Sequence, residues 1–201
     1  GWVPHGAEVF RVEDGCIVGE TGQGGFGWLV TEKTYGDFIL DLDVMIAPPG
    51  NSGIQVRSRF NDKRDMVGYQ IEIDSSERAW SGGLYEQGRR GWLQDLKDNP
   101  DARKAFKVGE WNRYRIACVG DSIRSWVNDV PVADWVDSLD VDGVIALQVH
   151  SGKDVRVRWR NLRIRDLGRR QWKPLWDGRT LAGWHPIGKG TWTIEDGAIV
   201  G

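Results

Sequence analysis

The sequence predicts an all-β protein, a jelly-roll β-sandwich in which one sheet carries a concave polar face. Segments of alternating apolar and polar residues recur along the chain, 27 Gly and 7 Pro supply turns between them, and helical periodicity is nearly absent. At 201 residues the chain is long enough to bury a full core in one domain of sandwich size. Many short antiparallel strands with long connections favour two packed sheets, one of which can curve around a ligand.

The expected strands follow one another closely. The alternation places them at residues 8–12, 16–19, 26–31, 37–46, 52–60, 67–74, 83–87, 112–119, 122–128, 143–150 and 155–166. Residues 111–128 form a predicted hairpin with Gly120 and Asp121 in its turn. Residues 100–106 hold a short helical turn that Asp101 favours. The Arg residues between 156 and 165 alternate with apolar residues, which indicates the solvated face of one bulged strand.

The composition excludes several classes of partner. Lys and Arg total 27 against 29 Asp and Glu, and the net charge of -2 predicts no binding to nucleic acid and no attraction to anionic membranes. No run approaches the ~20 apolar residues of a membrane span, and we recognise no signal-peptide pattern in the sequence. Cys16 and Cys118 match no metal-ligand spacing and alternate with apolar neighbours, which favours buried free thiols.

The end of the chain repeats its beginning. Aligned without a gap, residues 183–201 match residues 1–19 at ten of nineteen positions. We therefore expect a sugar-active jelly-roll domain at 1–167, a connector at 168–174 and the opening strands of a second copy at 175–201. Because so short a fragment cannot form its own core, we expect its apolar residues to pack on the first domain or on a neighbouring molecule. The latter case would be self-association through the repeat fragment.

Three of the expected strands place polar side chains on one face. Alternation along residues 54–60, 69–74 and 146–150 turns the following side chains away from the core: Gln55, Arg57, Arg59, Gln70, Glu72, Asp74, Gln148 and His150. A plain solvated face usually carries Lys, Glu, Thr and Ser, whereas these faces hold amides, guanidinium groups, carboxylates and an imidazole. That mixture of hydrogen-bonding groups suits a sugar, and we expect the three faces to form one site.

Aromatic residues in loops add candidate walls to this site. Trp80 and Trp92 flank Tyr85 and Glu86, and a sugar ring stacks readily on an indole. Glu86 is interpreted as a ligand on a loop that lines the cleft, with an ordinary ion pair as the competing interpretation. The Trp residues within or beside strands are expected in the core: Trp28, Trp111, Trp126 and Trp159.

Several motifs along the chain match one family of carbohydrate-active proteins. They are NSGIQVRS at 51–58, GYQIEID at 68–74, GLYE at 83–86, WNRYRI at 111–116, LQVHSG at 147–152 and RNLRI at 160–164. Together they resemble the 3-keto-glycoside 1,2-lyase / 3-keto-2-hydroxyglucal hydratase family, also described as 3-keto-disaccharide hydrolases. Residues 175–184 resemble that family's usual opening, which the first copy lacks before Gly1. The resemblance implies a concanavalin-A-like jelly roll that acts on oxidised sugars in the periplasm or outside the cell.

The chemistry implied by this resemblance is elimination. A ketone at C3 of a glycoside acidifies the C2 proton, so a base can remove it, the enolate can expel the C1 substituent, and water then adds to the unsaturated sugar. His150 suits the base, or a ligand of a divalent metal together with Glu86, and Arg57 suits the donor to the enolate oxygen. A cross-strand pair of Arg57 with a carboxylate is the structural alternative. Glu72 completes the candidate catalytic set, with Glu86 or Asp74 as the base if His150 is not. The expected sugar contacts are Gln55, Gln70, Asp74, Tyr85, Trp80, Trp92 and Gln148, and no organic cofactor is expected.

Two other functions stay open. Glu72, Asp74 and Glu77 have the Glu-x-Asp-x-x-Glu spacing of laminarinase-type retaining glycosidases, whose two Glu residues act at about 5–5.5 Å from each other. Ser75 and Ser76 replace the apolar pair that such a strand needs, so we expect the strand to end at Asp74. The second alternative is a non-catalytic carbohydrate-binding module, which would need only the aromatic walls and the glutamines.

Overall fold

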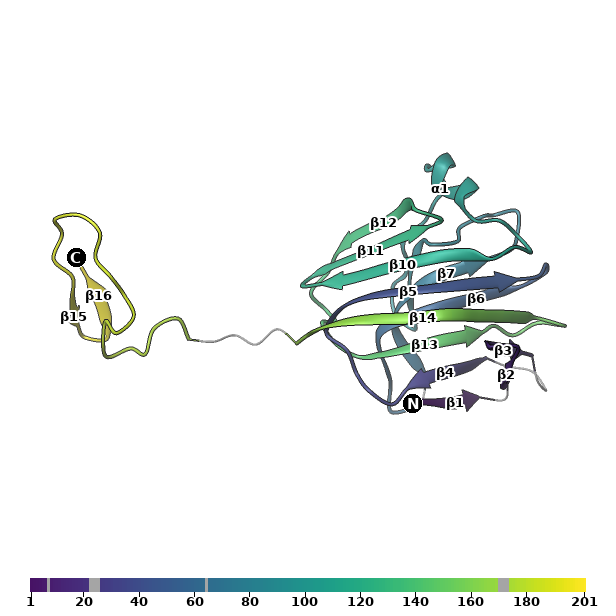
Figure 1. Ribbon diagram of the computed structural model, residues 1–201, viewed down its shortest axis with the longest axis horizontal. Coiled ribbons are helices and arrows are strands. Elements are labelled where there is room, and N and C mark those ends of the chain that lie inside the picture. Colours follow the sequence, from purple (N-terminus) through teal and green to yellow (C-terminus); the bar gives the residue numbers. More distant parts are fainter. Residues whose placement is uncertain (7, 22–25, 64, 170–173) are drawn as a thin grey trace. The chain divides into compact units, whose positions relative to one another are not determined.

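The chain divides into two compact units, Gly1–Arg170 and Gln171–Gly201. A computed structural model describes residues 1–6, 8–21, 26–63, 65–169 and 174–201. In the first unit these residues form two antiparallel seven-stranded sheets that pack face to face (Figure 1). The prediction of an all-β jelly-roll sandwich is confirmed. No helix in the described part of the chain is long and apolar enough to cross a membrane.

The first sheet brings the three polar strands side by side. Its strands, in spatial order, are β1 (Trp2–Gly6), β4 (Gly27–Thr31), β13 (Val144–Val149), β6 (Asn51–Phe60), β7 (Met66–Asp74), β8 (Leu84–Gln87) and β9 (Gly91–Gln94). The expected polar faces belong to β6, β7 and β13, which are consecutive in this order although β13 lies far from the others in sequence. The candidate site therefore depends on long-range strand pairing.

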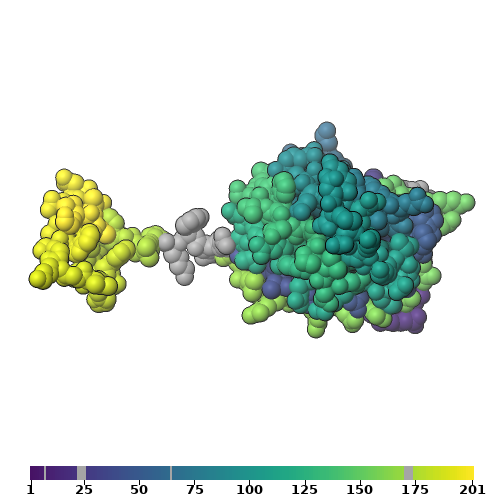
Figure 2. Space-filling model, turned by 90° about the horizontal axis from the view of Figure 1, so that it is seen from above, coloured from purple at the N-terminus to yellow at the C-terminus, as the bar shows by residue number. Residues whose placement is uncertain are grey.

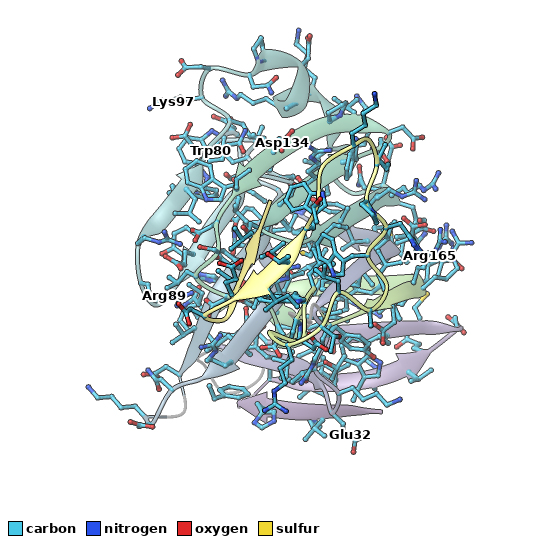
Figure 3. All side chains as sticks on the ribbon, turned by 90° about the vertical axis from the view of Figure 1, so that its left-hand side faces the viewer. Glu32, Trp80, Arg89, Lys97, Asp134 and Arg165 are labelled. Atoms are coloured by element: carbon cyan, nitrogen blue, oxygen red, sulfur yellow. The ribbon has the colours of Figure 1, made fainter. Side chains whose placement is uncertain are left out.

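The second sheet closes the other side of the core. Its strands, in spatial order, are β12 (Val130–Val136), β11 (Ser122–Val127), β10 (Asn112–Val119), β5 (Asp37–Ile46), β14 (Arg156–Gly168), β3 (Cys16–Glu20) and β2 (Val9–Glu13). The β10–β11 hairpin has the expected turn, and β14 has a register shift between Arg160 and Arg163. Arg165 is exposed at the periphery in Figure 3, so the bulged, solvated strand is also confirmed.

The core lies between the two sheets. Its largest fully buried apolar side chains include Trp159, Tyr69 and Tyr114. Cys16 and Cys118 are buried and free, as expected. The short helix α1 (Pro100–Ala105) follows an Asn99 cap and buries Ala102 and Ala105. The region of α1 and β10 to β12, in teal and green, forms much of the face seen in Figure 2.

The second unit contains one hairpin, β15 (Thr193–Glu195) and β16 (Ala198–Val200). Its turn residues Asp196 and Gly197 have φ angles of 50° and 72°, the same as Asp14 and Gly15 between β2 and β3. The pairing Glu195 to Ala198 also corresponds to Glu13 to Cys16. The repeated sequence thus forms the same local structure twice. The interpretation of 175–201 as the opening of a second copy stays a prediction.

The two hairpins differ in how much of their apolar surface is covered. In the first unit β3 pairs with β14, and Phe10 stacks on Trp159 at a centroid distance of 6.5 Å. In the second unit Trp192, which corresponds to Phe10, is 50% exposed. The packing of this unit on a first unit, within one molecule or between two, stays a prediction.

Candidate functional site

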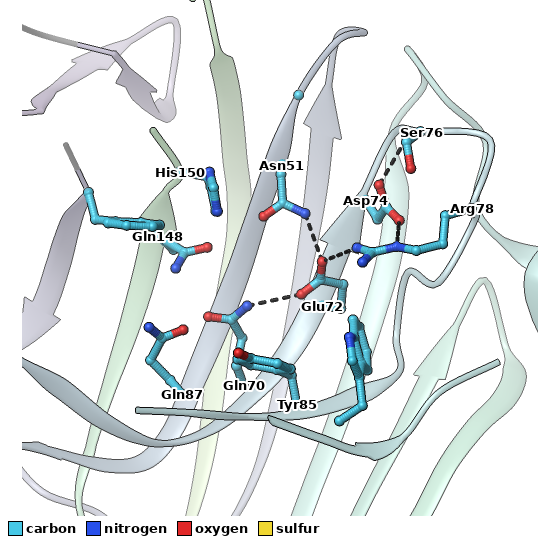
Figure 4. A pocket seen from close by; sticks show the side chains of 13 residues that line it. Asn51, Gln70, Glu72, Asp74, Ser76, Arg78, Tyr85, Gln87, Gln148 and His150 are labelled. Atoms are coloured by element: carbon cyan, nitrogen blue, oxygen red, sulfur yellow. Dashed lines mark hydrogen bonds and ion pairs between the residues drawn. The ribbon is translucent and has the colours of Figure 1, made fainter. Parts of the chain in front are cut away.

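A polar pocket of about 510 Å³ lies on the outer face of the first sheet (Figure 4). Ligand pockets in proteins are of this size. The residues that line it are Phe26, Gly50, Asn51, Gln70, Glu72, Asp74, Ser76, Arg78, Tyr85, Gln87, Trp92, Gln148 and His150. Seven of the eleven site residues predicted from the sequence are in this set: Gln70, Glu72, Asp74, Tyr85, Trp92, Gln148 and His150. The alternation of β7 and β13 therefore predicted a shared face correctly.

Strand register sets the floor of the pocket. Gly53 of β6 pairs with Gln148 of β13 on one side and with Glu72 of β7 on the other. The backbones of β13 and β7 are two strand spacings apart, about 10 Å. Between Gln148 and Glu72 the intervening strand β6 presents Gly53, which has no side chain. A Cβ atom on Gly53 would lie 2.4 Å from Cδ of Gln70. A larger residue at position 53 would therefore displace the Gln70 side chain, which lies across the glycine.

Glu72 is a buried carboxylate that faces this pocket. Its side chain is held by three donors: Asn51 Nδ2 at 2.7 Å and Arg78 Nη2 at 2.9 Å donate to Oε1, and Gln70 Nε2 at 3.0 Å donates to Oε2. A carboxylate offers about four lone-pair sites, so these contacts leave one on Oε2. Burial raises the pKa of Glu72 to about 7, although the bonds from Asn51 and Gln70 and the charge of Arg78 act in the opposite direction. Glu72 is thus able to accept a proton near neutral pH.

A chain of hydrogen bonds fixes Gln70 against Glu72. The Ser58 hydroxyl donates to Gln55 Oε1 at 2.9 Å, and Gln55 Nε2 donates to Gln70 Oε1 at 2.6 Å. Because Gln70 Oε1 is occupied as an acceptor, its amide nitrogen is directed to Glu72. Gln55 is fully buried and does not line the pocket. The expectation that it contacts the sugar is therefore wrong, and it holds Gln70 in place instead.

Arg78 and Asp74 form the wall beside Glu72. Arg78 Nε donates to Asp74 Oδ2 at 2.8 Å, and the guanidinium lies 4.9 Å and 5.0 Å from the ring centroids of Trp80 and Trp92. Burial disfavours the charge of Asp74, but hydrogen bonds from Ser76 and Arg78 outweigh this and lower its pKa. Asp74 is therefore a charged anchor for Arg78. Trp80 does not line the pocket. Its ring packs against Trp92, with 4.8 Å between the ring centroids, and against the Arg78 guanidinium.

Gln148 and His150 lie on the other side of the pocket from Glu72 in Figure 4. Gln148 is 1% exposed, and its Oε1 has no hydrogen-bond partner among the described residues. An unpaired buried acceptor is costly, and a sugar hydroxyl would satisfy it. His150 Nδ1 lies 2.8 Å from the carbonyl oxygen of Ser151, which can only accept, so Nδ1 carries a proton. Nε2 of the neutral ring is then the basic nitrogen.

Arg57 does not reach the pocket, and its predicted role at the enolate oxygen is wrong. The register of β6 shifts between Val56 and Arg59, and Arg57 has a φ of 49°. This bulge reverses the alternation and turns the side chain toward the second sheet. There it is fully buried, and it donates to the carbonyl oxygens of Gly36 and Gly120 and to Asp37 Oδ1 at 3.0 Å. Neither Glu72 nor Asp74 is its partner.

The prediction that Glu86 is a catalytic residue or a metal ligand of the pocket is also wrong. Strand register pairs Glu86 with Tyr69 of the core and its neighbour Tyr85 with Gln70 of the pocket. Both oxygens of Glu86 are bonded to arginines: Arg89 Nη2 lies 2.7 Å and Arg90 Nη2 3.0 Å from Oε1, and Arg90 Nε donates to Oε2. Among the described residues no three His, Cys, Asp or Glu side chains gather as a metal site. We therefore derive no step through a metal.

The laminarinase-type arrangement does not form. Strand β7 ends at Asp74, as expected, and Glu77 follows in an exposed turn outside the pocket. The sequence reasoning missed Asn51, Arg78, Gln87 and Phe26 as pocket residues. Asn51 continues the alternation of Gln55 and Gly53 by two more residues, so its signal was present. Arg78 comes from a turn, where alternation gives no information.

The fold and this pocket define a carbohydrate-active protein of the jelly-roll class. The chain belongs to the 3-keto-alpha-glucoside-1,2-lyase-like domain family, whose model matches residues 1–165. No curated protein matches the chain.

Solved structures give the same picture of the fold. A protein of Parabacteroides distasonis ATCC 8503, assigned provisionally as a glycosyl hydrolase, is 26% identical with a TM-score of 0.59 over 79% of this chain and 90% of that one. Carbohydrate-binding module CBM66 of Bacillus subtilis is 15% identical with a TM-score of 0.62 over 83% and 96%. A Bacillus subtilis protein of galectin-like fold is 15% identical with a TM-score of 0.60 over 84% and 90%.

Proposed function

We propose that this chain cleaves 3-keto-glycosides by elimination and then hydrates the unsaturated sugar, with Glu72 as the base. The observation that carries the proposal is a single buried carboxylate with a pKa of about 7 and a free lone pair at the pocket. A general base works best when its pKa lies near the working pH. Family membership of residues 1–165 supports the choice of substrate.

The base is assigned to Glu72 rather than to His150 for a chemical reason. Removal of the C2 proton needs a group that is desolvated and held rigidly, and three donors fix the Glu72 carboxylate. Oε2 takes the C2 proton, the C–H electron pair forms the enolate, and the bond from C1 to the leaving oxygen breaks. Arg78 is the only Lys or Arg among the described pocket residues and supplies positive charge for the enolate.

His150 has the second proton-transfer role in this proposal. In its protonated form it gives the Nε2 proton to the leaving oxygen and later takes one from the water that adds to C1. Departure of the leaving group opens the pocket to water, so Glu72 exchanges its proton with solvent before it protonates C2 in the hydration step, and acid and base recover their starting states. Gln148, with its unpaired Oε1, accepts a hydrogen bond from a sugar hydroxyl, and Tyr85 and Trp92 form an aromatic wall.

The test is to incubate the protein with the methyl 3-keto-glucosides of both anomers and with the unoxidised methyl glucosides. We expect 3-keto-glucose and methanol from a 3-keto-glucoside and no turnover of the unoxidised sugars. Turnover of unoxidised glucosides that depends on Glu77 would instead support the laminarinase-type function.

A carbohydrate-binding module is the second candidate, favoured by the wall of Tyr85 and Trp92, whose rings lie 5.3 Å apart. Binding of both sugar classes with no turnover of either would support it over the lyase. A periplasmic or extracellular location and self-association through the second unit remain parts of the proposal. They follow from the family resemblance and from the repeat.

A further inference from the structure

The outer face of the first sheet carries a second feature beside the polar pocket. Three of its buried side chains, Val30, Met66 and Ala146, form a small apolar cluster of their own, apart from the core between the sheets. Partly buried Trp28 and Phe60 pack on it. Trp28, expected in the main core, lies on this face because it pairs with Gln148, a pocket residue. An apolar patch therefore adjoins the polar pocket on the same sheet.

Aromatic rings make this patch continuous with the pocket. Phe26 lines the pocket, contacts His150 edge-on at 4.5 Å and stacks on Trp28 at 5.9 Å with an interplanar angle of 18°. Trp28 pairs across strands with His5, whose ring lies 4.7 Å from that of Phe60. We call these four residues, Phe26, Trp28, His5 and Phe60, the aromatic shelf. It begins at the His150 side of the pocket, away from Glu72.

We propose that the aromatic shelf binds an aromatic or otherwise flat, apolar aglycone of the glycoside. This inference rests on the proposed function, because elimination places the leaving group next to the residue that protonates it. His150 has that role, and Phe26 of the shelf contacts His150 directly. A sugar oriented with C2 toward Glu72 and its C1 substituent toward His150 therefore directs the aglycone onto the shelf.

The chemistry of the shelf favours an apolar ring over a second sugar. The pocket offers charged or amide side chains from Gln70, Glu72, Arg78 and Gln148 to sugar hydroxyls. The shelf offers mainly ring faces, and its polar groups are the His5 imidazole and the buried Nε1 of Trp28. Phe26 is 39% exposed, a large apolar surface to leave in water at the mouth of a polar pocket. A second sugar would bring hydroxyl groups onto this surface with few partners, and an aromatic ring would not.

The experiment compares benzyl and methyl 3-keto-glucosides of the same anomer. Benzyl alcohol and methanol are nearly equally acidic leaving groups, so a difference in KM reports binding of the ring. We expect the KM of the benzyl substrate to be about tenfold lower. Trp28→Ala and the milder Phe60→Ala are expected to remove most of this difference while leaving kcat and KM for the methyl substrate nearly unchanged.

The control is Trp111→Ala, which removes an indole stacked on Arg160 of the second sheet and should leave the preference intact. Equal KM values for the two substrates in the unmutated protein would overturn the shelf and leave the lyase function standing. If neither substrate is turned over, the lyase function fails. The shelf is then tested by equilibrium titration with the two unoxidised glucosides, where equal affinities overturn it and tighter benzyl binding that Trp28→Ala abolishes supports it.

Discussion

Glu72 and Glu86 lie on neighbouring strands and are both nearly inaccessible to water, yet their surroundings shift their pKa values in opposite directions. Glu86 has a lowered pKa because, against the cost of its burial, Arg89 and Arg90 bind both of its oxygens. Glu72 has one arginine and two neutral amides, and burial prevails over them. A buried carboxylate surrounded by cations is a structural anchor. One surrounded mainly by amides is left able to titrate, and it is the one that faces the pocket.

The largest expected effect is the loss of the Glu72 carboxylate. Glu72→Gln keeps the shape of the side chain and removes the base, so kcat for a 3-keto-glucoside should fall ~10²–10⁴-fold with the fold intact. The matched control is Glu77→Gln, the same change in an exposed turn, for which we expect unchanged kcat. Comparable losses in both variants would return the laminarinase-type pair to consideration. Steady-state kinetics with circular dichroism on each variant makes the comparison.

Arg57 extends the comparison to a buried cation outside the pocket. Arg57→Met leaves Asp37 without this partner and two carbonyls without a donor, so the free energy of unfolding should fall by ~3–5 kcal/mol. Arg124→Met, at an exposed pair with Asp134, should cost less than about 1 kcal/mol. Urea unfolding measures both. The folded fraction of Arg57→Met should keep the kcat of the unmutated protein, and a specific loss of kcat would place Arg57 in the mechanism after all.

The pH profile gives the next effect. A base must be deprotonated to act, and the pKa of Glu72 in the free protein is about 7, so kcat/KM should fall about tenfold per pH unit below that value. Between pH 4.5 and about 7 the folded protein keeps a proton on Glu72 that the unfolded chain releases. The contribution of Glu72 to the free energy of unfolding therefore falls as pH rises through that window. Glu86 acts oppositely, and its contribution is lost as pH falls through its lowered pKa. A flat profile of kcat/KM from pH 5 to 8 would contradict the assignment of Glu72 as the base.

The smallest expected effect concerns the floor of the pocket. Gly53→Ala forces Gln70 aside, because the new Cβ would lie 2.4 Å from its Cδ, and this weakens the hold on Glu72 Oε2. We expect roughly a tenfold loss of kcat. Gly190→Ala, in the second unit, meets only Trp192 Nε1 at 3.7 Å and serves as the control. An unchanged kcat in Gly53→Ala would show that Gln70 does not position the base.

The sequence predicted the parts of this site that regular strands display. Alternation placed Gln70, Glu72 and Gln148 on one face because β7 and β13 have no bulge within those residues. It failed at Arg57, where a residue other than glycine adopts a φ of 49° and no local signal announces the bulge. The prediction for Glu86 was also wrong. Tyr85 was correctly expected in the pocket, and alternation along the strand then places its neighbour Glu86 on the opposite face. Arg78 was missed because a turn, not a strand, carries it into the pocket.

The roles that we propose for Glu72 as base and His150 as acid could not be inferred from the sequence either. Imidazole is the usual group that titrates near pH 7, which favoured His150 as the base. The burial of Glu72 between Asn51, Gln70 and Arg78 depends on the pairing of β6 with β7 and on the turn after β7. Strand patterns predict which residues share a face, but not how far each is removed from water.

The most direct test of the elimination mechanism follows the hydrogen at C2. The reaction of a methyl 3-keto-glucoside is run in D₂O, quenched early with borohydride and analysed by NMR, with authentic 3-keto-glucose as the control for spontaneous exchange. Elimination and hydration must place a solvent deuteron on C2 of the product. The Glu72→Gln variant must abolish enzymatic formation of this product. A product that keeps its original C2 hydrogen would show displacement at C1 instead, and would contradict the role of Glu72 as the base.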